Sequence, residues 1–171
     1  MKWVWFFLRY TLAIISVILA FQFNFFYLVF KPVTFLLLRF LLSLFYRVQI
    51  SGTLFLINSV SVELVDACVA GSAYLLLLLL NLLIPGVSFF KRVKLFVVSA
   101  AIFLVVNLVR LLISIIVLEN GGAFGAIHLV FWYLSIVFVV VIWFLCSLIF
   151  KLKEIPIYSD LKFIIKKAKT R

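Results

Sequence analysis

Cys68, Arg110 and His128 are the residues of this chain with the clearest capacity for chemistry. A cysteine attacks an acyl carbon and forms a thioester, and a neighbouring cation favours the reactive thiolate over the thiol. Arg110 would stabilise a developing oxyanion or hold a substrate backbone, and His128 would accept or donate the proton. These residue types predict a thiol-based site, provided that the fold brings them together.

The elements that must position these residues are membrane-spanning helices. The chain has 171 residues, of which 68% are hydrophobic and 12% charged, and its mean hydropathy is +1.41. Soluble domains are roughly half apolar and about a quarter charged, so that class is excluded. We expect an all-α membrane protein with a bundle of about five transmembrane helices, four plus one short or interfacial. The apolar runs cover 3–30, 33–46, 60–84, 95–118 and 126–150.

Between the second and third runs the pattern changes. In "RVQISGTLFLIN" polar and apolar residues alternate, and Gly52 interrupts them. This period-2 alternation predicts a short extended hairpin over about 48–58. Its backbone must lie outside the lipid, where water or protein satisfies its hydrogen bonds. The predicted organisation is one transmembrane domain over 1–150 that includes this extracytoplasmic segment, followed by a basic cytoplasmic tail over 151–171.

Basic residues predict the orientation of the helices. Lys91, Arg92 and Lys94 lie in one loop, and seven more Lys or Arg residues lie in the tail. Such clusters mark the cytoplasmic side, so the three candidate residues fall in the outer half of three successive spans. The N-terminus is outside if 33–46 spans, which we favour, and inside if that run lies flat on the membrane.

Arg110 needs a partner, because a buried arginine costs at least about 2.5–3.5 kcal/mol on insertion scales. Glu63 and Asp66 are the acids at similar predicted depth, and Asn107 shares a helix face with Arg110. We expect all three to support the site. A plainer interpretation stays open, in which an Arg110–carboxylate pair only fixes helix packing, Cys68 is a small buried apolar residue and the histidine packs at the interface.

The remaining polar inventory is small. Cys146 lies near the predicted cytoplasmic end of its run, so we expect it to face lipid or to pack. No CxxC or paired histidine is present, which predicts no disulfide framework, metal or cofactor.

The net charge is +11, and the position of the basic residues beside apolar runs predicts binding to membrane lipid rather than to nucleic acid. In the tail, Leu161, Ile164 and Ile165 predict an amphipathic surface helix after Pro156.

Three motifs resemble the exosortase and archaeosortase family: "ELVDACVAG" at 63–71, "NLVRLLIS" at 107–114 and "GAIHLVFWY" at 125–133, with "ISGTLFLIN" before them. The resemblance extends over residues 33–145. In that family a Cys near an outer span end is followed by an Arg in the next span and a His or Arg in the one after. The resemblance therefore implies that Cys68, Arg110 and His128 are catalytic. Val69 is a departure, because the family usually has a small or hydroxyl residue directly after the Cys.

The function that this resemblance implies is that of a membrane-embedded cysteine protease or transpeptidase. Such an enzyme cuts exported proteins at a C-terminal sorting signal, which combines a short motif, one transmembrane helix and a basic cluster. Cleavage at the outer face of the plasma membrane passes through a thioester, and the product is transferred to an amine or hydroxyl acceptor. A non-enzymatic membrane subunit with a structural Arg–carboxylate pair is the alternative. An anion transporter that uses Arg110 ranks last, because only Asn81 and Ser99 continue a polar path toward the cytoplasm.

Overall fold

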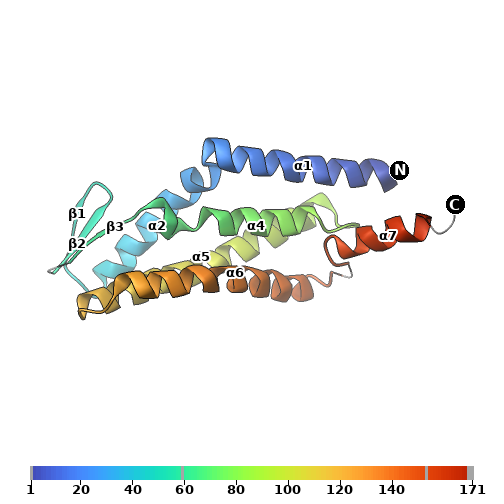
Figure 1. The fold of residues 1–171 in the computed structure, drawn as a ribbon. Helices are drawn as coiled ribbons and strands as arrows, with labels where there is room; N and C mark the ends of the chain where they lie inside the picture. The colour runs from blue at the N-terminus through green and yellow to red at the C-terminus, as the bar shows by residue number, and fades with distance from the viewer. Residues whose placement is uncertain (1, 59, 153, 169–171) are drawn as a thin grey trace.

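The computed structural model is an elongated bundle of helices with a small sheet at one end (Figure 1). It describes residues 2–58, 60–152 and 154–168, with the backbone alone for 2–3, 124, 128, 163 and 166–168. The helices are α1 (Lys2–Phe23), α2 (Phe25–Ser43), α3 (Asp66–Val69), α4 (Gly71–Leu82), α5 (Phe89–Glu119), α6 (Phe124–Ile149) and α7 (Tyr158–Ala168). The strands are β1 (Val48–Ser51), β2 (Leu54–Ile57) and β3 (Val60–Glu63). The predicted fold class, a mostly helical membrane protein with a short extended segment, is confirmed.

Four helices, α1, α2, α5 and α6, are long and apolar enough to cross a membrane, and α4 is a shorter apolar helix. Only 11% of the most apolar stretch of α1 is buried, and only 39% of that of α5. Apolar side chains therefore cover most of the outer surface of these helices, which far exceeds the apolar patches of soluble monomers. Hydrocarbon suits such a surface, so the protein is a multi-pass membrane protein.

The first two helices follow one another in the same direction. They meet at Asn24, whose left-handed backbone (φ 47°) separates α1 from α2. Pro32, at the predicted boundary between the first two apolar runs, lies inside α2 instead. Figure 1 shows that α1 begins at the end of the bundle where α7 ends, and that α2 continues toward the sheet. The two termini consequently share one end of the bundle.

Side-chain contacts with α4 fix this course. Near the start of α1, Arg9 donates a hydrogen bond of 2.9 Å to the carbonyl of Leu83, the residue after α4. Near the start of α2, the ring of Phe30 stacks on Tyr74 with centroids 3.6 Å apart. A Cβ on Gly71 would lie 2.7 Å from the Tyr27 ring, so the missing side chain lets α2 approach α4 closely.

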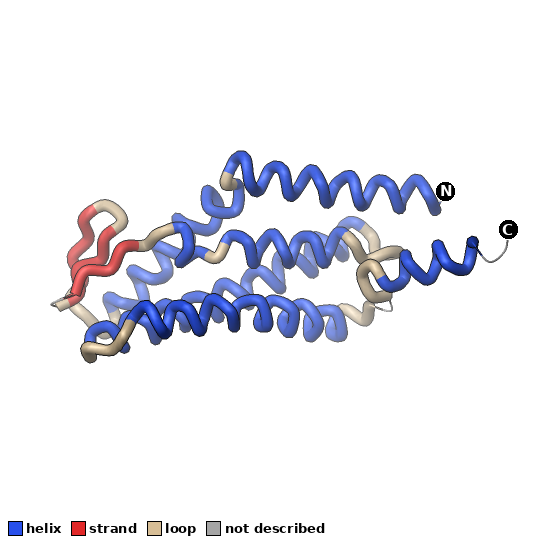
Figure 2. The backbone as a smooth tube through the Cα atoms, in the orientation of Figure 1, coloured by secondary structure: helices blue, strands red, loops and turns tan. Residues whose placement is uncertain are grey.

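The sheet confirms the predicted hairpin and adds a third strand. The order is β1-β2-β3, with antiparallel pairs throughout (Figure 2). Along each strand, successive side chains point to opposite faces of the sheet. Ile50, Phe55 and Val62 are aligned across the three strands, and Phe55 is fully buried against α2 and α5. Gly52, with φ +62°, makes the tight turn between β1 and β2.

The apolar run 60–84, which we expected to be one span, is not one helix. Val60–Glu63 is strand β3, the chain is extended through Val65, and α3 is a single turn. Ala70 then adopts a left-handed conformation (φ 56°) before α4 begins. Hydropathy alone does not separate a β-branched strand followed by a short helix from a continuous apolar helix, which explains the error.

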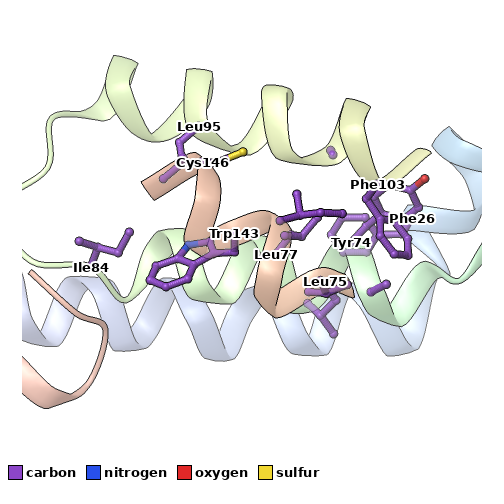
Figure 3. Close-up of a cluster of buried hydrophobic side chains, with 13 residues drawn as sticks. Phe26, Tyr74, Leu75, Leu77, Ile84, Leu95, Phe103, Trp143 and Cys146 are labelled. Carbon is purple, nitrogen blue, oxygen red and sulfur yellow. The ribbon is translucent and has the colours of Figure 1, made fainter. Parts of the chain in front are cut away.

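Two clusters of buried apolar side chains hold the bundle together. The larger gathers α4, α5 and α6 around Tyr74, with Phe103 edge-on to its ring (Figure 3). Cys146 is 1% exposed within this cluster, so it packs rather than faces lipid. The second cluster lies beneath the sheet and includes Cys68. The two cysteines are therefore separated, and both are free thiols.

The predicted tail helix is present as α7, and it carries a contact that the sequence did not suggest. Asp160 in its first turn forms an ion pair of 2.7 Å with Arg9, and both side chains are largely buried. The hydroxyl of Tyr10 donates to the same carboxylate at 3.3 Å. These bonds attach the last helix to the first.

We expect epitope tags at the N- and C-termini to lie on the same side of the membrane, because α1 begins where α7 ends. A third tag at Gly52, where no atom lies within 4 Å of an added Cβ, should lie on the opposite side. Protease protection in sealed vesicles measures all three. Opposite accessibility of the two terminal tags would contradict the course of α1 and α2.

Candidate functional site

The candidate site is built around α3, a helix of one turn with a backbone break on each side. Val65 before it is extended, and Ala70 after it is left-handed. A continuous helix would bond each carbonyl to the N–H four residues later. The break at Ala70 leaves carbonyls of α3 without that donor, in a protein whose surroundings contain little water. An unsatisfied backbone group in such surroundings costs several kcal/mol.

Two side chains of α5 satisfy these carbonyls. Asn107 donates from Nδ2 to the carbonyl oxygen of Cys68 at 2.9 Å, and Arg110 donates from Nη2 to that of Ala67 at 3.3 Å. Both side chains are almost completely buried, with 1% and 3% of their surface exposed. The predicted grouping of Asn107 and Arg110 with the residues around Cys68 is therefore present, through the backbone of α3.

Arg110 also contacts α6. Its Nη1 donates to the Ser135 hydroxyl at 3.3 Å, and that hydroxyl in turn donates to the carbonyl of Phe131 at 2.7 Å. Ser114 donates to the backbone carbonyl of Arg110 itself. The Arg110 guanidinium thus connects α5 to both α3 and α6. It lies about 24 Å along α5 from Lys94, the last basic residue at the start of that helix, at a rise of 1.5 Å per residue.

The predicted acidic partners of Arg110 lie elsewhere. Asp66 pairs with Lys31 of α2 at 2.7 Å, and Glu63 on β3 has Thr53 as its neighbour at 3.4 Å. Within the described residues neither acid bonds Arg110, so the expected Arg110–carboxylate pair is wrong. The cause is the strand β3: extended backbone carries Glu63 into the sheet, and the single turn of α3 directs Asp66 toward α2.

Cys68 lies beneath the sheet, with 4% of its surface exposed. Beside it is a cavity of about 10 Å³, which has room for about one water molecule. Phe55 and Leu64 from the sheet side and Leu111 from α5 are among the residues around this cavity. The sheet and α5 therefore enclose the sulfur.

The electrostatics of the thiol combine opposing influences. Cys68 lies in α3, outside the four spanning helices. Burial raises the pKa of the thiol, whereas the backbone bond to Val65, the Arg110 charge and the Lys31 charge each act to lower this pKa. Burial has the largest effect, so the pKa of Cys68 lies above its ordinary value and the two cations only partly offset the burial. The thiolate is the form that acts as a nucleophile, so the thiol must first lose its proton.

His128 lies in the first turns of α6, seven residues before Ser135. Seven residues are two helical turns, or about 10 Å along the axis. Its side chain lies outside the described part of the chain, so its predicted part in the site stays a prediction.

A groove of about 330 Å³ lies between α5 and α6, within the size range of ligand sites. Its walls are apolar, with Val105 and Val109 partly exposed, and its polar atoms come from Asn107, Arg110 and Ser135. Asn107 Oδ1 and Arg110 Nε are buried and have no hydrogen-bond partner in the structure. Both atoms belong to residues that line the groove, but each is buried, so the accessible surface of the groove is almost entirely apolar.

Comparisons with protein-family models, curated proteins and solved structures give no match for this chain. In the part of the chain that the structure describes, no three His, Cys, Asp or Glu residues gather in a way that could hold a metal ion. The class that the fold defines is a multi-pass membrane protein with a buried Cys–Asn–Arg arrangement around a broken helix. Lys31 and Ser135 belong to that arrangement and were not suggested by the sequence motifs.

Replacing Asn107 with Leu should destabilise the protein by about 1–3 kcal/mol, because the carbonyl of Cys68 loses its donor in a buried place. Denaturant titration in lipid nanodiscs measures the free energy of unfolding. Ser114→Ala is the matched control on α5, since Ser114 bonds only within its own helix and should cost less. Equal stability of Asn107→Leu and the wild type would contradict this role of Asn107.

Proposed function

We propose that this protein is a membrane-embedded cysteine protease or transpeptidase with Cys68 as the nucleophile. The observation that supports it most directly is the contact of Arg110 with the carbonyl of Ala67, which brings a buried cation beside the cysteine. A buried cation is costly, and its positive charge would stabilise the negative charge that develops on the carbonyl oxygen of a substrate.

The reaction would proceed through a thioester. His128, the proposed general base, takes the proton of the Cys68 thiol. The sulfur attacks the carbonyl carbon of a peptide bond, and the new C–S bond forms as the carbonyl oxygen becomes an oxyanion stabilised by Arg110. The C–N bond then breaks, and the leaving amine takes a proton, for which His128 is the proposed donor. An amine or hydroxyl acceptor attacks the thioester and restores the thiol.

The proposed substrates are exported proteins with a C-terminal sorting signal, as the family resemblance implies. The position of Cys68 supports this class, because the residue lies just before α4, toward the end of the bundle that carries the sheet, where one end of a substrate helix packed along the bundle would also lie. The apolar walls of the α5–α6 groove are suited to an apolar segment of polypeptide within the membrane. Closure of the sheet over the sulfur would exclude water and favour transfer over hydrolysis.

The second candidate is a non-enzymatic membrane subunit, in which Asn107 and Arg110 serve only to satisfy the carbonyls of α3. The two hydrogen bonds to Cys68 and Ala67 favour it specifically. Under this alternative, substitution of Arg110 lowers the amount of folded protein, and substitution of Cys68 has no effect on any processing reaction.

We expect Cys68→Ala and Cys68→Ser to abolish processing at unchanged protein level, and Arg110→Ala to slow it by about 10²- to 10³-fold. Quantitative mass spectrometry of C-terminal peptides follows uncleaved sorting signals in cells that carry each variant, so no particular substrate need be known beforehand. Cys146→Ala is the matched control, because that thiol lies in the other cluster and should leave processing intact. Normal cleavage in cells with Cys68→Ala would contradict the proposal that the protein is a cysteine protease or transpeptidase.

A further inference from the structure

Three consecutive residues of α3 are each held by a polar side chain from another helix. Arg110 and Asn107 of α5 bond the carbonyls of Ala67 and Cys68, and Lys31 of α2 bonds the carboxylate of Asp66. The first two contacts satisfy backbone groups, which accounts for them structurally. The third contact satisfies no backbone group and therefore calls for a different explanation.

Stability alone gives a poor account of the pair between Lys31 and Asp66. Its distance is short, at 2.7 Å, but 36% of the Lys31 side chain and 53% of the Asp66 side chain are exposed. Exposed ion pairs contribute about 0–1 kcal/mol, because water screens the charges and the side chains lose rotamer freedom. The pair has a second effect, because it holds the ammonium group of Lys31 in one position.

We propose that Lys31 is a positioning residue of the candidate site, held by Asp66 so that a second cation, which comes from α2, lies near the single helical turn that carries the Cys68 thiol. This inference rests on the proposed function for its biological purpose. Its physical content, a thiol whose ionisation depends on a lysine from α2, holds for the folded protein without any substrate.

The charged groups around Cys68 come from four elements. Arg110 belongs to α5, Lys31 to α2, Asp66 to α3 and Glu63 to β3, where Glu63 borders the small cavity beside the sulfur. Burial has the largest effect and raises the pKa of the thiol, and the charges of Arg110 and Lys31 act against that rise. A lysine side chain has four flexible carbons, so it needs an anchor to hold its ammonium in one place. Asp66, two residues before the cysteine, supplies that anchor.

The test is the pH dependence of Cys68 alkylation by iodoacetamide, in full-length protein in lipid nanodiscs. All variants carry Cys146→Ala, so that Cys68 is the only thiol. Because Cys68 is buried, the reagent reacts through open states, and the opening equilibrium scales the rates at every pH. The midpoint of the pH profile is therefore the informative quantity, and thermal unfolding of the same samples verifies that each variant is folded.

Lys31→Gln keeps a hydrogen-bond donor for Asp66 but removes the charge, and Lys31→Met removes both. We expect both variants to raise the midpoint and to slow alkylation near neutral pH by about three- to tenfold, because less of the thiol is ionised without the lysine charge. Lys31→Arg should keep the wild-type midpoint. Arg39→Gln, eight residues further along α2 and exposed, is the matched control and should also keep it.

An unchanged midpoint in folded Lys31→Gln or Lys31→Met would overturn the proposal, and so would an equal rise in Lys31→Arg. A lower unfolding temperature with an unchanged midpoint would assign Lys31 a purely structural role and also overturn it. These outcomes are separate from the fate of the proposed function. Intact processing with Cys68→Ala would contradict the proposed function. The alkylation profiles would still decide whether Lys31 affects the ionisation of Cys68.

Discussion

Satisfaction of backbone carbonyls at a broken helix is the constraint on which the rest of this structure depends. The chain turns out of the sheet, makes the single turn of α3 and breaks again at Ala70 before α4 can begin. In water such a break would cost little, because solvent would bond the freed carbonyls. Beside hydrocarbon the bonds must come from protein. Asn107 and Arg110 supply them, and this requirement explains why two strongly polar side chains are buried in the middle of α5.

The same requirement also places polar side chains close to Cys68, where they could take part in a reaction. Each side chain uses part of its hydrogen-bonding capacity on α3 and retains a free atom, Oδ1 on Asn107 and Nε on Arg110. Both residues line the groove between α5 and α6, whereas Cys68 borders the small cavity under the sheet. The hydrogen bonds of Asn107 and Arg110 to α3 thus link the large apolar groove to the nearly closed cavity beside Cys68.

Much of the fold was predictable because its signals are local. The helices of the last two apolar runs exist near the predicted bounds, and the period of 2 in 48–58 identified β1 and β2. The third strand was missed because Val60 and Val62 extend an apolar run, and hydropathy carries no information on backbone conformation. The grouping of Cys68 with Asn107 and Arg110 was anticipated from depth, since helix rise converts spacing into height. The partner of Asp66 was not, because Lys31 is 35 residues away and no spacing rule connects the two.

The ion pair between Arg9 and Asp160 has a consequence for how the protein is made. The two residues are 151 positions apart, one near the start of the chain and the other near its end. At about 5–20 residues per second, a ribosome completes Asp160 about 8–30 s after Arg9. During that interval the first helix enters the membrane with a guanidinium that has no counter-charge. The contact between α1 and α7 therefore forms late, after the other helices of the bundle have been made.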